Sequence, residues 1–274
     1  LLQMKIFKDK KSLIDEISNK KNIAFVPTMG SIHEGHLSLI KKAKKDSKNV
    51  LVSIYVNPKQ FNVNSDFKKY PRNIRKDIAI LKKTKVKYLY LPTYADIYSF
   101  RPILPVYLDR FSKKLCGKFK PGHFKGVVNV VNRFIEIIKP SLIYLGLKDF
   151  QQLNLIKLHI NKKKIRTKII ACTTIREKNG IALSSRNILL NKQQIEIAVR
   201  IYKYLKNIKK KIVPANLKKK KLDILNKIFL LGAKKIDYLE YINIKTLKSP
   251  KKINEIYNIF IAYYVGNVRL IDNL

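Results

Sequence analysis

Two histidines stand three residues apart directly after an apolar segment. The segment Ile23–Pro27 is followed by Gly30, and then His33 and His36 flank Gly35. The apolar run predicts a buried strand, and Gly30 permits a tight turn before a helix that we expect to begin near His36. Unpaired backbone N–H groups and the helix dipole at such a corner favour a phosphate. Two imidazole N–H groups can also donate to phosphate oxygens as negative charge builds up.

A single histidine at this place would more often cap the helix or lie in the core. The H-x-G-H spacing after a strand instead indicates nucleotidyl transfer. Gly35 between the two rings would let a purine or ribose approach the backbone.

Polar residues follow two further apolar segments. Gln60 comes after Val50–Val56, and its amide offers donors and an acceptor that suit hydroxyl and carboxylate groups. Lys148 follows Leu142–Gly146 and can neutralise phosphate charge, and Gln152 lies one helical turn further on. Taken alone, Gln60 would be a solvated loop amide. Lys148 would be a surface cation, because the chain has 59 Lys and Arg residues.

A serine–arginine segment lies further along the chain. Ser184, Ser185 and Arg186 supply hydroxyls, N–H groups and a forked cation, which are groups that can bind phosphate. The alternative is a turn that caps a helix, and both roles can hold together.

The elements that must position these residues alternate through the first two thirds of the chain. This alternation predicts an α/β fold, a Rossmann-like doubly wound parallel sheet over residues 1–175. The segment Val127–Ile138 is ambiguous, and we predict a helix from its length. The other expected strands are Ile23–Pro27, Val50–Val56, Val86–Leu91, Leu142–Gly146 and Ile165–Ala171, and the other expected helices are Leu37–Ser47, Ile74–Lys83 and Phe150–Ile160.

In residues 176–274 two expected helices are followed by three short expected strands. This order predicts a smaller α+β lid domain. Gln193–Ile208 and Leu217–Leu231 are expected helices on either side of a break around Pro214. The lysine runs Lys209–Lys211 and Lys218–Lys221 flank this break; we interpret them as solvated surface, with an approach to the nucleotide as the alternative. The expected strands are Tyr238–Ile244, Tyr257–Val265 and Val268–Ile271, with a hairpin turn at Gly266–Asn267.

The formal net charge of +41 would by itself indicate a nucleic-acid-binding protein. Lys far outnumbers Arg, however, and the lysines are spread along the whole chain together with abundant Ile, Asn and Tyr. Such a skew is typical of an AT-rich genome, whereas surfaces that bind nucleic acid favour Arg. We therefore expect no nucleic-acid partner.

The apolar runs, the N-terminal segment and the cysteines indicate where the protein is located in the cell. No apolar run reaches the roughly 20 residues that span a bilayer, and Leu1–Lys11 has no signal-peptide pattern. Cys116 and Cys172 are far apart, with no metal-binding spacing near either. We expect a cytoplasmic protein without membrane contact or a protein-held metal.

At this point the sequence resembles the pantothenate synthetase family (pantoate–β-alanine ligases) within the H-x-G-H nucleotidyl-transferase superfamily. H-x-G-H alone marks only the superfamily, but further blocks in this order resemble this family over nearly the whole chain. The blocks are Val26–Gly30, Glu34–Leu39, Ser53–Phe61, Tyr70–Arg72, Gly122–Gly126, Gly146–Leu153, Thr174–Glu177, Leu183–Asn187 and Arg269–Asn273.

The resemblance implies a ligase that activates pantoate with Mg-ATP as an acyl-adenylate and joins it to β-alanine, giving pantothenate, AMP and pyrophosphate. His36 would be the principal catalytic residue, assisted by His33, Lys148 and Arg186. Gln60 would bind pantoate and β-alanine, Gln152 would bind pantoate, and the protein would form a homodimer. The implied ATP-binding residues are Met29, Gly30, Ser31, Ile32, His33, Glu34, Gly35, His36, Gly146, Leu147, Lys148, Asp149, Ile175, Leu183, Ser184, Ser185 and Arg186.

One position departs from the family pattern. The family usually has Gly-Glu-Lys-Asp where this chain has Gly146-Leu-Lys-Asp149, so Leu147 removes a carboxylate from the expected nucleotide rim. Two alternatives remain beside the ligase: another H-x-G-H adenylyl transferase, and a basic nucleic-acid-binding protein. The first would keep the histidines without Gln60 and the Gln151–Gln152 pair in these contexts.

Overall fold

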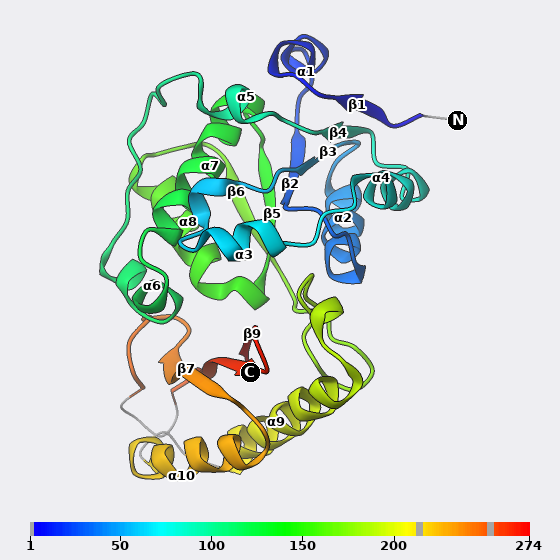
Figure 1. The fold of residues 1–274 in the computed structure, drawn as a ribbon. Helices are drawn as coiled ribbons and strands as arrows, with labels where there is room; N and C mark the ends of the chain where they lie inside the picture. Colours follow the sequence, from blue (N-terminus) through cyan, green and yellow to red (C-terminus); the bar gives the residue numbers. More distant parts are fainter. Residues whose placement is uncertain (1–2, 212–215, 251–254) are drawn as a thin grey trace. The chain divides into compact units, whose positions relative to one another are not determined.

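The computed structural model describes residues 3–211, 216–250 and 255–274, and the chain divides into two compact units. Unit 1 comprises residues 1–174 and unit 2 residues 175–274. The chain course of each unit can be followed in Figure 1.

Unit 1 is built on a six-stranded sheet in which all the paired strands are parallel. The strand order is β1-β4-β3-β2-β5-β6, so β2 and β5 are neighbours in the middle although two strands separate them in the sequence. The strands are β1 (Lys5–Phe7), β2 (Ile23–Thr28), β3 (Asn49–Ile54), β4 (Tyr88–Tyr90), β5 (Leu142–Gly146) and β6 (Lys168–Cys172).

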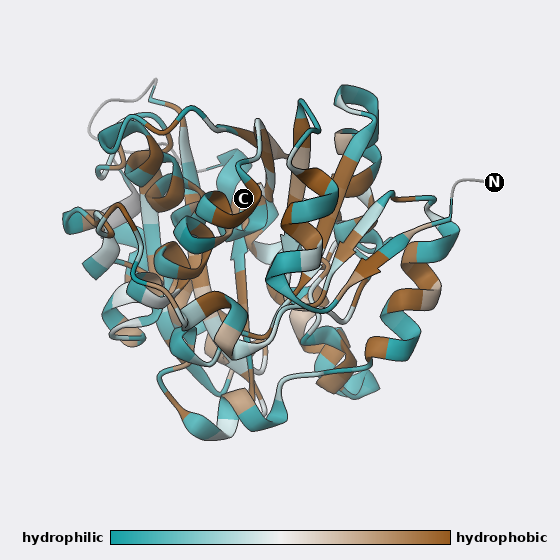
Figure 2. Cartoon of the chain, turned by 90° about the horizontal axis from the view of Figure 1, so that it is seen from above, coloured by the Kyte–Doolittle hydropathy of each residue, from teal (hydrophilic) through white to brown (hydrophobic). Residues whose placement is uncertain are grey.

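Helices cover both faces of this sheet. In Figure 1, α2 (Glu34–Asp46) and α4 (Ile74–Lys83) lie together on one side, and α7 (His123–Ile138) and α8 (Phe150–Lys162) lie together on the other. Figure 2 shows brown and teal residues alternating along helices of the chain, as expected for helices that pack through one face. The remaining helices of unit 1 are α1 (Lys10–Ile17), η1 (Pro58–Gln60), α3 (Asn64–Lys69), α5 (Tyr94–Tyr98), η2 (Arg110–Lys113), α6 (Cys116–Phe119) and η3 (Leu147–Asp149).

Unit 2 combines two long helices with a small antiparallel sheet. The helices are α9 (Lys192–Lys211) and α10 (Leu217–Leu230), and the short η4 (Asn187–Leu189) precedes α9. The sheet has the order β7-β8-β9, with β7 (Lys235–Asn243), β8 (Tyr257–Val265) and β9 (Val268–Asn273). Buried side chains of both helices and of the sheet form one apolar core, which includes Ile201, Ile228 and Ile261.

The predicted fold class is confirmed. The ambiguous segment Val127–Ile138 is helical, as predicted, because it lies within α7 (His123–Ile138). Gly266 takes the left-handed conformation of the predicted hairpin turn (φ 57°). The helix α2 begins at Glu34, within two residues of the start expected near His36. The strand β1 and the helix α1 were not predicted, and the break around Pro214 lies outside the described residues.

The two lysine runs fall at helix ends, with Lys209–Lys211 in the last turn of α9 and Lys218–Lys221 in the first turns of α10. Within the described ranges, every helix is too short or too polar to cross a bilayer.

Candidate active site

The predicted site residues of unit 1 follow the carboxyl ends of three adjacent strands. The H-x-G-H corner follows β2, Gln60 follows β3, and Lys148 follows β5. Since β3, β2 and β5 are neighbours in a parallel arrangement, the three segments emerge at the same edge of the sheet. The chain moves outward to β3 on one side of β2 and returns to β5 on the other. This topological switch point is where open α/β sheets bind ligands.

Both imidazoles take part in capping α2. His33 is the N-cap residue, and its Nδ1 accepts a hydrogen bond from the Gly35 N–H (3.1 Å). Nδ1 of His36 accepts from the N–H of His33 (3.4 Å), and the two rings lie with their centroids 4.1 Å apart. The capping role that a lone histidine would have is therefore present, and it explains why the helix begins two residues before His36.

These contacts define the protonation of both rings. Because each Nδ1 accepts from a backbone N–H, the proton of each neutral imidazole is on Nε2. Burial and the charge of Lys148 lower the pKa of His33 to about 4. Burial, His33 and Lys148 lower the pKa of His36 to about 3. At neutral pH both rings are uncharged donors through Nε2–H, and the shared effect of Lys148 shows that this cation lies close to them.

The backbone N–H groups before α2 are largely paired within the protein. The N–H groups of Ser31 and Ile32 donate to the two carboxylate oxygens of Asp77 (2.8 Å each), and the N–H of Gly30 donates to Oγ1 of Thr28 (3.2 Å). The expectation that unpaired N–H groups receive a phosphate is therefore wrong for residues 30, 31, 32, 33 and 35. The imidazole Nε2–H groups of this corner have no hydrogen-bond acceptor in the described part of the chain, so we treat them as candidate donors to an anion.

Gln60 is held in place at the end of β3 by residues from other elements. The buried Asn57 accepts from the hydroxyl of Tyr98 (2.9 Å) and donates to the carbonyl of Gly126 (3.2 Å). The carbonyl of Gln60 accepts from Nδ1 of His123 (2.6 Å), and its side-chain amide contacts Sδ of Met29. Gly126 permits this approach, because a Cβ there would lie 2.0 Å from the carbonyl oxygen of Lys59. Gln60 is thereby placed next to the corner that follows β2.

Two neighbouring glutamines that follow β5, Gln151 and Gln152, have different environments. Gln151 is buried and donates to the carbonyls of Phe111 (2.8 Å) and Lys114 (2.7 Å), so it holds the chain around η2. Gln152 lies in the first turn of α8 and is partly exposed, as a ligand-contacting residue must be. The ammonium group of Lys148 lies 3.8 Å from a carboxylate oxygen of Asp149.

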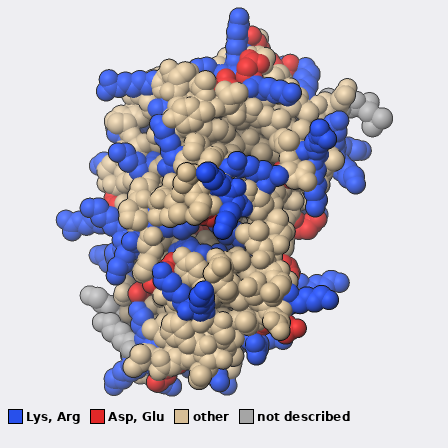
Figure 3. All heavy atoms as spheres, viewed as in Figure 1, with Lys and Arg blue, Asp and Glu red and all other residues tan. Residues whose placement is uncertain are grey.

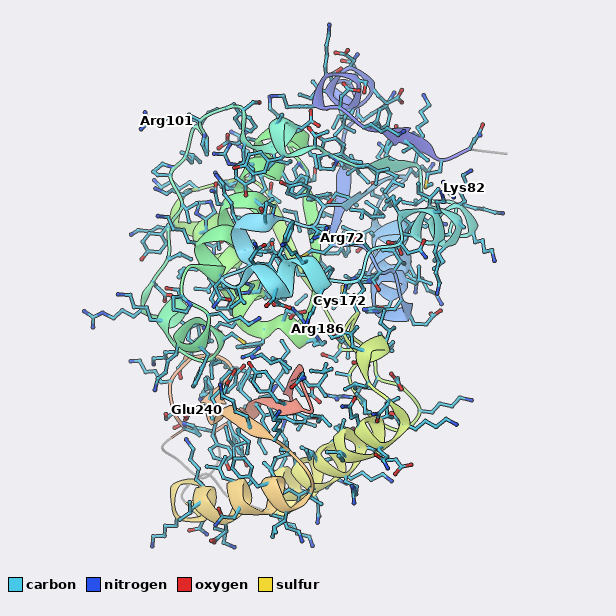
Figure 4. All side chains as sticks on the ribbon, viewed as in Figure 1. Arg72, Lys82, Arg101, Cys172, Arg186 and Glu240 are labelled. Atoms are coloured by element: carbon cyan, nitrogen blue, oxygen red, sulfur yellow. The ribbon has the colours of Figure 1, made fainter. Side chains whose placement is uncertain are left out.

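The predicted nucleotide-binding residues of unit 2 form a tight hairpin and turn. The N–H of Leu183 donates to the carbonyl of Ile175 (3.0 Å), so these two residues lie side by side. Oγ of Ser184 accepts from the N–H of Arg186 (3.2 Å), a contact within the turn. The N-cap residue of η4 is Arg186, without a side-chain capping hydrogen bond, so the helix-capping alternative is wrong. Figure 4 shows Arg186 on this segment.

Side chains at the base of this hairpin hold it to the rest of unit 2. Arg176 forms a two-pronged ion pair with Asp272 of β9 (2.7 and 2.9 Å), and Asn187 donates to Glu177 (3.0 Å).

The sequence did not single out Asp77, Asn57 and His123 as parts of the site. His123 and Asn57 stand in the family-like blocks Gly122–Gly126 and Ser53–Phe61, so the signal for them was present. Arg72, which ends the family-like block Tyr70–Arg72, is labelled in Figure 4. Its guanidinium carbon lies 4.4 Å from the centroid of the Phe67 ring.

The charge distribution and the potential metal ligands complete the description. Figure 3 shows Lys and Arg side chains spread over the visible face of both units. Among the described residues, no three His, Cys, Asp or Glu side chains gather as a metal site. The carboxylate of Asp149 lies beside Lys148, and one such carboxylate suits a magnesium ion carried mainly by phosphate and water oxygens.

Comparisons with known proteins agree on one family. The model of the family "Pantoate-beta-alanine ligase" matches residues 4–274. A pantothenate synthetase of Fervidobacterium nodosum is 41% identical over 96% of this chain and 95% of its own length, and one of Clostridium botulinum is 40% identical over 92% and 90%.

Solved structures give the same result. The crystal structure of a pantoate–β-alanine ligase from Francisella tularensis, complexed with β-γ ATP and β-alanine, is 40% identical with a TM-score of 0.83, covering 99% of this chain and 97% of that one. A pantothenate synthetase from Thermus thermophilus is 28% identical with a TM-score of 0.86, covering 99% of both chains.

Proposed function

The chain belongs to the pantoate–β-alanine ligase family, and on this basis we propose that it activates pantoate with ATP as an acyl-adenylate before joining it to β-alanine. The observation that carries this proposal is the meeting of the H-x-G-H corner, Gln60 and Lys148 at the switch point between β2 and β5. The ATP and β-alanine bound by the ligase from Francisella tularensis support the same substrates for this chain.

In the first step an oxygen of the pantoate carboxylate attacks the α-phosphorus of Mg-ATP, and the bond to pyrophosphate breaks. This step needs positioning and electrostatic stabilisation more than covalent help from the protein. The Nε2–H groups of His33 and His36 donate to phosphate oxygens, and Lys148 supplies the positive charge. Since both imidazoles are neutral before ATP binds, their pKa values rise as the triphosphate approaches.

In the second step the amine of β-alanine attacks the acyl carbon of the adenylate. The carbon–nitrogen bond forms, AMP leaves with the electrons of the acyl–oxygen bond, and the amine loses a proton. Gln60 and Gln152 hold the hydroxyls and carboxylate of pantoate in place for both steps. The contact of Gln60 with Met29 supports its position beside the nucleotide.

Unit 2 provides the remaining contacts in this proposal. Ile175 and Leu183 lie against the adenine and ribose through their backbone, and the Ser184–Arg186 turn binds the β- and γ-phosphates as a lid. The pairing of Leu183 with Ile175 supports their joint role. Magnesium would enter with ATP, and the carboxylate of Asp149, which lies 3.8 Å from the ammonium of Lys148, would accept from its water shell. A cytoplasmic location and a homodimer remain parts of the proposal.

The test separates the two half-reactions. We expect pyrophosphate release from ATP when pantoate alone is added, and AMP together with pantothenate when β-alanine follows. A chain that releases pyrophosphate only with another acid, or with none, would not have this function.

A further inference from the structure

Asp77 is a buried carboxylate that touches none of the predicted substrates. It lies on α4, is 2% exposed, and is separated in the sequence from the corner that it contacts. Oδ2 accepts from the N–H of Ser31 and Oδ1 from the N–H of Ile32, both at 2.8 Å. Each carboxylate oxygen thus has its own backbone donor.

The turn that Asp77 holds is unusual in its backbone. Gly30 and Ser31 both have positive φ values, 78° and 50°. Serine seldom takes this conformation, so the surrounding contacts must stabilise it. A Cβ at Gly30 would lie 2.9 Å from Oδ2 of Asp77, so the turn and the carboxylate are fitted closely.

Successive N–H groups in such a turn form a concavity that attracts anions. In this chain the concavity already contains an anion of the protein itself, the carboxylate of Asp77. A triphosphate cannot use the same two donors, and negative charge from Asp77 disfavours a phosphate there. The imidazoles of His33 and His36, which directly follow the turn, can donate instead through Nε2–H.

We propose that Asp77 is a positioning residue for adenylation: it fixes the Gly30–Ile32 turn and so directs the triphosphate to the histidines. The inference rests on the proposed function, because it assigns the histidines to ATP. Asp77 acts through the turn, whose next residue is the N-cap His33. Asparagine cannot replace it, since its NH2 group would face one of the two backbone donors.

The first test is the variant Asp77→Asn, which keeps the shape and exchanges one acceptor for a donor. We expect the kcat for pantoate-dependent pyrophosphate release to fall about 100-fold, because small displacements of catalytic groups cost that much. ATP affinity should also weaken, while the KM for pantoate should change less than threefold. A kcat within about twofold of wild type would overturn the proposal.

A double-variant cycle distinguishes positioning from general damage. If Asp77 acts through the histidines, adding Asp77→Asn to His36→Ala lowers turnover little beyond His36→Ala alone. If the double variant loses turnover by the product of the two single-variant factors, the proposal is overturned.

The matched control is Asp237→Asn in unit 2. Asp237 is also buried, with its side chain 3% exposed, and accepts from Nε of Arg269 (2.7 Å). This variant should lower thermal stability but keep near wild-type pyrophosphate release.

Two further measurements test the role of Asp77 if Asp77→Asn fails to fold or if the proposed function fails. Should Asp77→Asn fail to fold, Gly30→Ala disturbs the same contact and should give the same loss; wild-type turnover in it would contradict the proposal. Should wild type release no pyrophosphate with pantoate, the proposed function fails. Binding of a fluorescent ATP analogue then still tests Asp77, with at least tenfold weaker binding expected for Asp77→Asn and equal binding overturning the inference.

Discussion

The two units hold their predicted nucleotide-binding segments in different ways. In unit 1, side chains accept backbone N–H groups of the corner after β2: Asp77 reaches it from α4, and Thr28 and the two imidazoles belong to the corner itself. In unit 2, the ion pair of Arg176 with Asp272 ties the segment from Ile175 to Asn187 to β9. The other contacts given for this segment lie within it, such as those of Asn187 with Glu177 and with the carbonyl of Ala182, and that of Ser184 with the N–H of Arg186.

In the proposed function, the two segments have different tasks. A corner whose donors are fixed before ATP arrives is preorganised for the reacting phosphate. A turn anchored at its base can adapt to the outer phosphates, as a lid does. Four experiments test or sharpen the contrast.

The largest effect is expected in the corner of unit 1. His36→Ala removes one neutral donor and Lys148→Ala removes the adjacent cation, and each should lower pyrophosphate release by about 10²–10³-fold. The measurement is a single-turnover assay with pantoate at saturation. Turnover close to wild type in His36→Ala would show that the reacting phosphate lies elsewhere.

The base of the unit 2 hairpin should control stability more than chemistry. Arg176→Ala leaves the carboxylate of Asp272 without its partner in a largely buried place, which should destabilise unit 2 by about 3 kcal/mol. Amide hydrogen exchange should show faster exchange in unit 2 than in unit 1. The exposed Arg200 on α9 gives the control, because Arg200→Ala should change little. Uniform destabilisation of both units would contradict the separation.

Acid should distinguish the units, because all four histidines lie in unit 1. Burial lowers the pKa of the fully buried His159 to about 4, so the unfolded chain takes up its proton first as the pH falls below about 6.5. Stability that is present above pH 6.5 is therefore lost toward pH 4, by about 1.4 kcal/mol per pH unit for this one group. His33 and His36 shift in the same direction.

Hydrogen exchange at pH 7 and pH 5 measures this effect, since most carboxylates titrate below that range. Protection should fall more in unit 1 than in unit 2. His159→Gln removes one titrating group and should flatten the slope, whereas an unchanged slope would assign the effect to other groups.

The smallest effect is expected at the unit 2 turn. Ser184→Ala removes one neutral hydrogen bond, worth about 1 kcal/mol. We expect the KM for ATP to rise about fivefold with kcat nearly unchanged. A loss as large as that of His36→Ala would remove the contrast between a fixed corner and an adaptable turn.

Much of this site could be predicted from local patterns. Apolar runs ending at Pro27 and Gly146 correctly located the ends of two central strands, and the parallel order of the sheet then brought the following residues to one edge. The start of α2 was predicted to within two residues, although a histidine is an uncommon N-cap residue. Gln151 and Gln152 look alike in the sequence, and only the packing around η2 shows that Gln151 is structural.

Other parts had no local signal. Asp77 lies on α4 among lysines and arginines, where a carboxylate would be expected to face solvent, and only the packing of α4 brings it to Ser31. The strand β1 has three residues, too few for a periodic pattern. In unit 2, the resemblance to a family located the Ser184–Arg186 turn, since a serine–arginine pair has no spacing that marks chemistry by itself.

The central claim is that a pantoate carboxylate oxygen attacks the α-phosphorus at the switch point of unit 1. Pantoate labelled with 18O in its carboxylate tests it most directly, by mass spectrometry of the nucleotide after one turnover with ATP and β-alanine. The account predicts AMP that carries one 18O atom in its phosphate. AMP without label, or label found in inorganic phosphate, would contradict it.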